Sequence, residues 1–365
     1  MSTLAIVGAT GFVGTALTLK LLDQGHHVVA LSRHPEKWPL QHKNLKVIKG
    51  DLLKGQVVEQ LLKEADAAYY LVHGLHAEEQ DFEWEEARSA TNFAAAATKA
   101  KLQKTIFLGA LGPSEEASLH LRSRHLVGDI LGLSAAACIE FRASIVLGAN
   151  STSFEMIKAI TQRLPVRPYA SWLETPCQPI AKEDLLSYLV AALETEVVGH
   201  HIVEIGSPQV VPYGDLLDLY AKNENLVRPK FLLPVADQRM LMPVLELVVP
   251  EYQEVGKKLF MSLEFPTVVT DRSAEELFPD ITPMSLDEAM NQAYEASDTE
   301  YPAVWEGDFW KELKDHTLLQ TRQGQQILVD KLKELTESGL PKNAVELLKD
   351  KIRKRFPRRK GKERE

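Results

Sequence analysis

The stretch Leu4-Ala-Ile-Val-Gly8-Ala-Thr-Gly11-Phe-Val-Gly14 decides the fold expected of this chain. Its apolar start is typical of a buried strand, and its glycines are typical of a turn into a helix that binds the pyrophosphate of a dinucleotide. The first glycine permits the tight turn, the second lets phosphate approach the backbone, and the third lets the helix pack closely on the sheet. Amides at the helix N-terminus then face the anion.

We therefore expect this turn to contact a dinucleotide through Gly8, Thr10, Gly11, Phe12, Val13 and Gly14. Three glycines in seven residues are also compatible with an ordinary loop. The context favours the nucleotide site, because a helix-forming segment runs from Thr15 to Leu22. Gly25 then ends the helix, and a second apolar run follows at residues 28–31.

The composition is that of a globular protein, with 365 residues, 45% hydrophobic and 25% charged. Two cysteines, Cys138 and Cys177, are too few for a disulfide framework, so we expect a cytoplasmic protein. The early first strand and the lack of a long apolar run predict neither a signal peptide nor a membrane span. The histidines show no metal-ligand spacing, so we expect no metal site.

The net charge of −9 is unevenly distributed, because residues 342–365 carry 11 Lys/Arg and only 4 Asp/Glu. The acidic remainder argues against nucleic acid as a partner. For the basic tail three alternatives remain: peripheral contact with an anionic membrane, docking on the acidic body or a partner, or a solubilising end. The oligomeric state is not predicted.

Strand and helix patterns alternate up to about residue 150, which predicts an α/β fold with a Rossmann doubly wound parallel sheet. The runs are continuous and apolar, as expected of strands buried on both faces. Predicted strands cover residues 3–8, 27–32, 45–49, 67–72, 104–108 and 137–147, and predicted helices cover residues 12–23, 55–64, 81–101 and 119–133. After residue 150 the pattern loosens, and short strands are predicted at residues 200–205, 229–234 and 267–270.

We predict three parts along the chain. Residues 1–150 form the dinucleotide-binding Rossmann domain, and residues 151–297 form a smaller substrate lobe that completes one unit with it. Residues 298–365 form a helical extension that ends in the basic tail. Because ligands of open α/β sheets bind at the carboxyl ends of the strands, we expect a small-molecule substrate in a cleft between the two lobes.

The residues after the second predicted strand favour NADP over NAD, although NAD remains possible. An acidic residue usually binds the adenosine ribose there in NAD-binding proteins, but this chain has Ser32-Arg33. Arg33 can pair with a 2′-phosphate, and Ser32 can add a hydrogen bond. Arg33 could equally be a solvated loop charge. Asp51-Leu52 follows the third strand, where Asp51 suits either the adenine amino group or a helix N-cap.

Several motifs together resemble the short-chain dehydrogenase/reductase superfamily, in its extended and atypical NmrA-like and epimerase-like members. They are Gly8-x-x-Gly11-x-x-Gly14, Gly50-Asp51-Leu52, Leu71-Val-His-Gly74 and Phe141-Arg-Ala-Ser-Ile-Val-Leu-Gly148. Ser123-Arg-His-Leu-Val-Gly-Asp-Ile-Leu131 and Cys177-Gln-Pro-Ile-Ala-Lys-Glu-Asp184 are similar to motifs of an atypical bacterial subgroup. The resemblance covers residues 1–296 and implies an NAD(P)-binding oxidoreductase. His73 follows the fourth predicted strand, and we expect it to touch the cofactor through its backbone.

The chain departs from this superfamily at the catalytic residues. Active members carry a Tyr and a Lys one helical turn apart, and these positions fall on His120 and Arg124. The usual serine falls near Ala110. We expect His120 to act as a general acid–base with a pKa nearer neutrality than that of tyrosine, and Arg124 to hold ribose or phosphate. The alternative is that both are polar surface residues of a domain without that chemistry.

Three functions follow from this pattern. The first is an NADP-dependent oxidoreductase that moves hydride between the cofactor and a carbonyl, an alcohol or a C=C group. The second is a non-catalytic protein that senses NADP(H) or uses it in assembly, which the missing Tyr and Ser favour. The third is a nucleotide-sugar epimerase or dehydratase, which normally needs the same absent Tyr.

Overall fold

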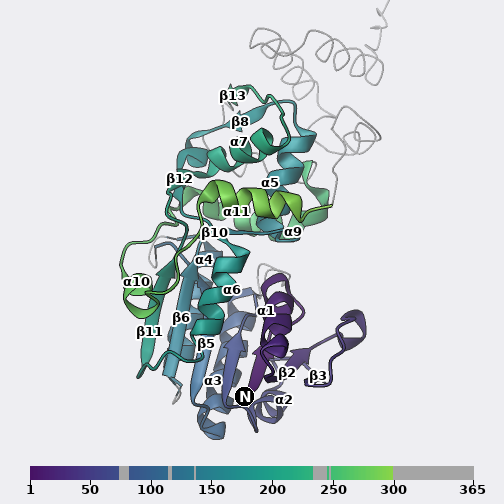
Figure 1. The fold of residues 1–365 in the computed structure, drawn as a ribbon, viewed down its shortest axis with the longest axis vertical. Helices are drawn as coiled ribbons and strands as arrows, with labels where there is room; N and C mark the ends of the chain where they lie inside the picture. Colours follow the sequence, from purple (N-terminus) through teal and green to yellow (C-terminus); the bar gives the residue numbers. More distant parts are fainter. Residues whose placement is uncertain (74–81, 114–116, 135–136, 233–244, 246–247, 299–365) are drawn as a thin grey trace, which may run out of the picture. The chain divides into compact units, whose positions relative to one another are not determined.

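The computed structural model describes residues 1–298 apart from 74–81, 114–116, 135–136, 233–244 and 246–247 (Figure 1). The described chain divides into two compact units. The first contains residues 1–155, 174–213 and 254–298, and the second contains residues 156–173 and 214–253 among those described. Of the predicted extension 298–365, only residue 298 is described, so the basic tail lies outside the described residues.

The first unit is built on a sheet of seven parallel strands, ordered β11-β6-β5-β4-β1-β2-β3. The strand order reverses between β1 and β4, so this pair marks the topological switch point where ligands bind. The predicted α/β Rossmann fold is confirmed. The strands are β1 (Thr3–Val7), β2 (His27–Ser32), β3 (Leu45–Lys49), β4 (Ala67–Tyr70), β5 (Lys104–Ala110), β6 (Ala137–Ala143) and β11 (His200–Ile205).

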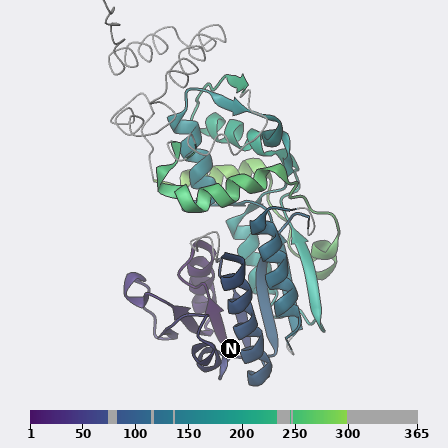
Figure 2. The same cartoon turned by 180° about the vertical axis from the view of Figure 1, so that it is seen from behind.

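Helices cover both faces of this sheet, as Figures 1 and 2 show from opposite sides. One face packs against α1 and α6, and the other packs against α2, α3 and α4. Along β1, Leu4 and Ile6 enter the first core while Ala5 and Val7 enter the second, because neighbouring strand residues point to opposite faces. The helices are α1 (Phe12–Asp23), α2 (Gly55–Leu62), α3 (Phe82–Ala100), α4 (Leu119–Gly132) and α6 (Lys182–Ala191).

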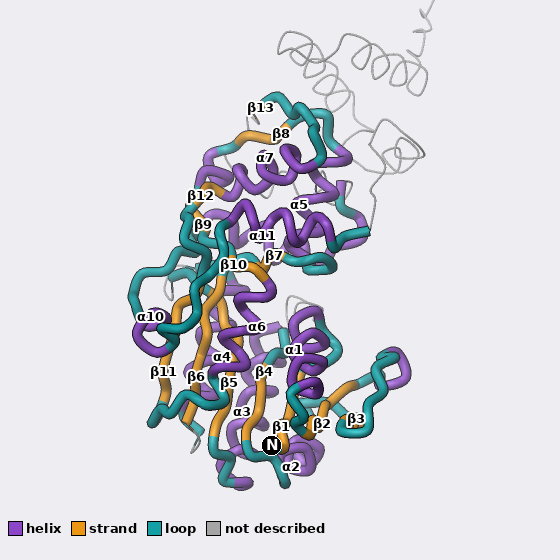
Figure 3. Tube along the Cα trace, in the orientation of Figure 1, coloured by secondary structure: helices purple, strands orange, loops and turns teal. Residues whose placement is uncertain are grey.

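Shorter elements complete the first unit, as the tube in Figure 3 shows. Strands β7 and β10 pair in parallel, and β9 and β12 pair antiparallel. These elements are β7 (Val146–Leu147), β9 (Pro176–Cys177), β10 (Ile180–Ala181), β12 (Val211–Pro212), α9 (Gln253–Met261), α10 (Ser273–Leu277) and α11 (Leu286–Glu295).

The second unit is small and contains a two-stranded parallel ribbon of β8 (Arg167–Tyr169) and β13 (Lys230–Leu232). It also takes in most of α5 (Thr152–Arg163) and α7 (Tyr213–Asn223). The side chain of Arg167 is 1% exposed and contacts Asp215 at 3.1 Å and Asp218 at 3.5 Å. Two carboxylates thus balance the one buried charge of this ribbon.

The structure departs from the sequence-based elements in three places. The predicted strand 137–147 is divided, because β6 ends at Ala143 and β7 begins at Val146. The predicted strand 267–270 is reduced to a bridge between Cys177 and Thr267. The predicted strand 200–205 exists, but it is the seventh strand of the central sheet, so part of the predicted lobe 151–297 belongs to the first unit.

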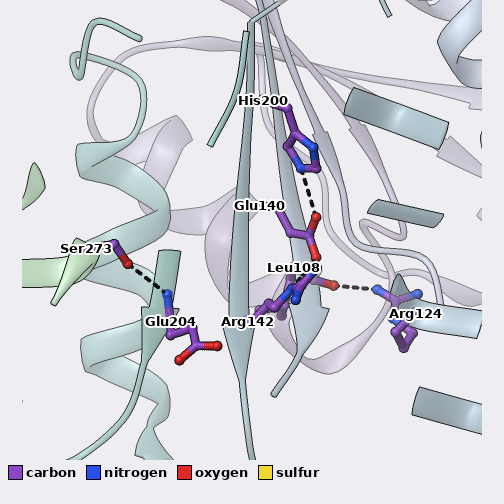
Figure 4. Close-up of polar contacts among 7 residues, drawn as sticks. All are labelled: Leu108, Arg124, Glu140, Arg142, His200, Glu204 and Ser273. Carbon is purple, nitrogen blue, oxygen red and sulfur yellow. Dashed lines mark hydrogen bonds and ion pairs between the residues drawn. The ribbon is translucent and has the colours of Figure 1, made fainter. Parts of the chain in front are cut away.

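A buried ion cluster lies on the α4 face of β6 (Figure 4). Glu140 is fully buried, and its two carboxylate oxygens contact Arg142 Nε at 2.7 Å and His200 Nε2 at 2.9 Å. A Cβ added at Gly128 of α4 would lie 2.2 Å from this carboxylate, so the helix packs directly on the ion cluster. Burial raises the pKa of Glu140, but the hydrogen bond with His200 and the charge of Arg142 outweigh it, so the pKa lies below its ordinary value.

Within the described part of the chain, no helix is both long and apolar enough to span a bilayer.

Candidate dinucleotide site and the polar groups beside it

The glycine turn brings three backbone segments together with no side chain between them. Gly8 has φ +82°, and a Cβ there would lie 2.6 Å from the carbonyl carbon of Leu71 after β4. A Cβ at Gly14 would lie 2.1 Å from the carbonyl oxygen of Gly8. Both contacts are closer than real Cβ atoms approach, so the turn, the helix α1 and the end of β4 require these two glycines.

Gly11 differs, because the added Cβ would meet only the Gly8 carbonyl oxygen, at 3.3 Å. Gly11 is exposed and forms the N-cap of α1 without any side-chain cap, and no acidic residue lies in the first turn. No side-chain cap and no carboxylate therefore compete for the first-turn amides of Phe12 and Val13, and these amides suit a pyrophosphate. The Phe12 ring lies over Gly148, where a Cβ would come within 2.8 Å of it.

The end of β2 presents one cation for the adenosine half of a dinucleotide. Ser32 is buried, and its Oγ accepts the backbone N–H of His34 at 3.2 Å. Arg33 is exposed, and its guanidinium makes no hydrogen bond or ion pair within the described residues. The neighbouring His34 and Lys49 both contact Glu36, at 3.2 and 3.7 Å.

Asp51 and Leu52 lie in the turn between β3 and α2. The Asp51 carboxylate accepts the backbone N–H of Leu53 at 2.9 Å, while the N-cap of α2 is Lys54. Asp51 therefore stabilises its own turn rather than the helix end, and the adenine contact stays a prediction. Leu52 is buried in the second core, and its carbonyl accepts Asn92 Nδ2 at 2.8 Å.

Arg124 is buried under the carboxyl ends of β4 and β5, with only 3% of its side chain exposed. Nη1 donates to the carbonyl of Val72 at 2.8 Å, and Nη2 donates to the carbonyl of Leu108 (Figure 4). The guanidinium lies 3.5 Å from Glu86 Oε1 and 4.7 Å above the Phe107 ring. It is therefore not a surface residue, and its ties to protein carbonyls leave the predicted ribose contact untested.

Four polar side chains, linked to one another, lie beside this guanidinium. Glu86 of α3 is buried and accepts Ser123 Oγ at 2.8 Å. Its other oxygen lies 3.9 Å from His73 Nδ1. The ring of His73 stacks on the ring of His120, with centroids 4.6 Å apart and planes 5° apart. The structure thus brings together the predicted residues His73, His120 and Arg124, and adds Glu86 and Ser123.

The environment of His120 opposes its protonation. Only 7% of His120 is exposed, and its Nδ1 has no hydrogen-bond partner among the residues that the structure describes. Burial, together with the positive charges of Arg124 and Lys258, lowers the pKa of His120 to about 3. This direction departs from the expectation of a pKa nearer neutrality than that of tyrosine, and it favours an imidazole that is neutral at pH 7. It cannot then supply a proton as an imidazolium ion, and its catalytic role stays a prediction.

A chain of three hydroxyl groups lies at the end of β6, and sequence reasoning missed it. Ser144 Oγ lies 2.6 Å from Thr267 Oγ1, which lies 2.7 Å from the Tyr213 hydroxyl. The three residues are separated by 123 and 54 positions in the sequence. Ser144 belongs to the Phe141–Gly148 motif, but no local pattern indicates the partners that the fold brings to it.

No described group of three or more His, Cys, Asp or Glu side chains is arranged to hold a metal ion. Both cysteines are buried, and neither forms a disulfide bond within the part of the chain that the structure describes. Burial, followed by the charge of Glu140, raises the pKa of the Cys138 thiol to about 12, as expected of a residue that packs rather than reacts.

Comparisons with known proteins agree with this geometry. Residues 8–144 match the family model described as NAD(P)H-binding, which begins at the first glycine of the turn and ends just after β6. The chain therefore carries an NAD(P)H-binding domain, as the glycine turn predicted. This match and the solved structures below support the resemblance to the atypical short-chain dehydrogenase/reductase superfamily.

Solved structures with this fold cover most of the chain. The enzyme WbmH of Bordetella bronchiseptica, in complex with NAD⁺, is 18% identical with a TM-score of 0.61, over 81% of this chain and 98% of that one. The UDP-glucose 4-epimerase of Thermotoga maritima, solved with UDP-glucose, is 12% identical with a TM-score of 0.61, over 80% and 98%. Identities this low establish the fold alone.

Curated relatives match only a short stretch. Uncharacterized proteins of Mycobacterium tuberculosis and Mycobacterium bovis are 39% identical over 64 residues. This stretch spans 17% of the chain and only 7% of the length of each relative.

Replacing Gly11 by Asp should abolish dinucleotide binding while the protein stays folded. The added Cβ makes one tight contact, 3.3 Å from the Gly8 carbonyl oxygen, and the charge of the side chain would occupy the pyrophosphate space at the start of α1 and repel the phosphate. We expect at least a ~100-fold weaker Kd for NADPH, equivalent to about 2.7 kcal/mol, measured by fluorescence titration. Gly55→Asp, at the start of α2, is the matched control and should bind normally. Unchanged affinity in Gly11→Asp contradicts the assignment.

The buried His120 should make stability depend on pH. Because its folded pKa lies below the unfolded value, the unfolded chain binds a proton between pH 6.5 and about 3, and stability falls as pH falls. From pH 7 to pH 5 the native protein should lose about 2 kcal/mol more stability than His120→Asn, measured by urea denaturation at both pH values. The exposed His27→Asn should behave like the native protein. Identical losses in all three would refute the buried neutral imidazole.

Proposed function

We propose that the chain is an NADP(H)-dependent oxidoreductase that acts on a carbonyl or alcohol group of a small molecule. The observation that carries the proposal is the start of α1 at the β1–β4 switch point, which has no side-chain cap. Arg33 at the end of β2 adds a guanidinium that makes no hydrogen bond or ion pair within the described residues. NADP(H), when bound, supplies the hydride acceptor or donor. The protein's own part is to bind the dinucleotide, orient it across the strand ends and hold the substrate oxygen.

The preference for NADP rests on charge. A 2′-phosphate at the end of β2 would meet the free guanidinium of Arg33 and no carboxylate of that loop except Glu36, which already contacts His34 and Lys49. Arginine pairs with phosphate in bidentate geometry, and such charge-assisted bonds are about twice as strong as neutral ones. NAD lacks the 2′-phosphate and gains nothing from this pair.

The second candidate, a non-catalytic NADP(H)-sensing or assembly protein, is favoured by one specific observation. Arg124 is bound to protein carbonyls, and His120 is buried and neutral, so the two positions that carry catalysis in the resembled family serve packing here. The nucleotide-sugar epimerase alternative has only the low-identity structures in its favour, and these concern the fold.

Turnover separates these candidates. The full chain should oxidise NADPH, followed by absorbance at 340 nm, in the presence of at least one compound of a panel of ketones and aldehydes, and UDP-glucose is incubated with the chain separately. UDP-glucose converted to UDP-galactose without net NADPH oxidation would instead establish the epimerase. NADPH binding without any turnover would leave the sensing protein.

Cofactor choice should depend on Arg33. Arg33→Ala should weaken NADPH binding by about 10- to 100-fold, because a charged hydrogen-bonded pair contributes about 1.5–3 kcal/mol, and should leave NADH affinity unchanged. Titration of both cofactors by fluorescence measures the ratio. Arg272→Ala, at an exposed arginine paired with Glu275, is the matched control. Equal loss for NADH and NADPH would disprove a 2′-phosphate contact.

A further inference from the structure

Either oxygen of each pair in the hydroxyl chain of Ser144, Thr267 and Tyr213 can donate, and the unequal burial of the three residues favours donation from Tyr213 toward Ser144. Tyr213 is 7% exposed and Thr267 is 4% exposed, whereas Ser144 is half-buried. A buried phenol must give its proton to an acceptor, and Thr267 Oγ1 lies 2.7 Å away. In this direction Thr267 donates to Ser144 Oγ at 2.6 Å, and the Ser144 proton then has no acceptor among the hydrogen bonds of the described residues.

Burial also keeps this direction fixed. It raises the pKa of the Tyr213 phenol far above its ordinary value, so the phenol stays protonated and remains a donor at every physiological pH. Successive hydrogen bonds polarise one another, which makes the last hydroxyl of the chain a better donor than an isolated serine.

Ser144 lies where a substrate is expected. It follows the last residue of β6, and ligands of open α/β sheets bind outside the carboxyl ends of the strands. Ala143 pairs with Ala110 at the end of β5, and its carbonyl accepts the N–H of Leu111 at 2.9 Å. Strands lie about 4.8 Å apart, so Ser144 lies three strand spacings, about 14 Å, from the glycine turn on the β4 side of the switch point.

We propose that Ser144 Oγ–H donates a hydrogen bond to the reacting oxygen of the substrate, with Thr267 and Tyr213 as positioning residues that supply its direction. The proposal rests on the proposed oxidoreductase function for the identity of that oxygen. The role requires hydrogen-bond donation only, so no covalent bond to Ser144 forms or breaks. A donor aimed at developing negative charge on this oxygen contributes about 100- to 1,000-fold in kcat.

The first experiment measures turnover, with the full chain and the panel ketone that is reduced fastest. Ser144→Ala should lower kcat by about 100-fold, and Ser144→Thr, which keeps the hydroxyl, should restore most of it. Tyr213→Phe should cost less, about three- to ten-fold, because it removes polarisation but leaves the Ser144 proton in place. Ser187→Ala, on α6 with its Oγ bonded to the Glu183 carbonyl, is the matched control.

The second experiment needs no turnover. The infrared band of carbonyl-¹³C-labelled acetophenone is recorded with the protein and NADP⁺, a pair that cannot react because both partners are oxidised. We expect a bound band shifted to lower wavenumber in the native protein, lost in Ser144→Ala, weakened in Tyr213→Phe and retained in Ser187→Ala. A merely structural role of Tyr213 would leave the band position unchanged. Thermal melts establish that each variant is folded, and Ser144→Cys replaces Ser144→Ala should the latter not fold.

The two experiments separate the two proposals. A shifted band that depends on Ser144, without turnover of any panel compound, supports the hydrogen-bond donor and overturns the oxidoreductase. Turnover with no shifted band, or with a band and kcat unaffected by Ser144→Ala, overturns the role of Ser144 and leaves the oxidoreductase standing.

Discussion

The close contact between the Gly8 carbonyl and the first turn of α1 is the constraint on which the rest of the first unit depends. The missing side chain at Gly14 lets the helix lie against this carbonyl, and the missing side chain at Gly8 lets the end of β4 approach β1. Any Cβ at either position would overlap backbone atoms. The helix start is thereby aimed at the point where the strand order reverses, which is where we propose that backbone amides bind the pyrophosphate.

Two buried networks of charged side chains pack against the central sheet, one around Arg124 and one around Glu140. Arg124 joins the carbonyls after β4 and β5 to Glu86, while Glu140 joins Arg142 to His200 on β6 and β11. Buried charges persist only when paired and hydrogen-bonded, and breaking such a pair costs about 3–5 kcal/mol. Arg124 of α4 therefore stabilises the ends of β4 and β5, and these contacts limit the chemistry in which its guanidinium can take part.

This limitation explains why family resemblance is a poor guide to the catalytic residues here. The position that carries a tyrosine in the resembled family holds a neutral imidazole stacked on His73, and the position of the lysine holds a guanidinium bound to carbonyls. Three hydroxyl groups nevertheless meet at the neighbouring strand end. Ser144 follows β6, Thr267 lies in the segment after α9, and Tyr213 begins α7. A fold can keep the place of a polar group while changing the elements that provide it.

The sequence by itself determined the parallel sheet and the glycine turn, because strand–helix alternation and the spacing of three glycines are local patterns with local physical causes. It also placed Arg33 at the end of β2 without an acidic neighbour before it. Only the tertiary structure decided that His200–Ile205 is the seventh strand, that His120 is buried between cationic neighbours, and that Ser144 meets Thr267 and Tyr213. Burial and long-range pairing set those features, and neither is encoded in the spacing of neighbouring residues.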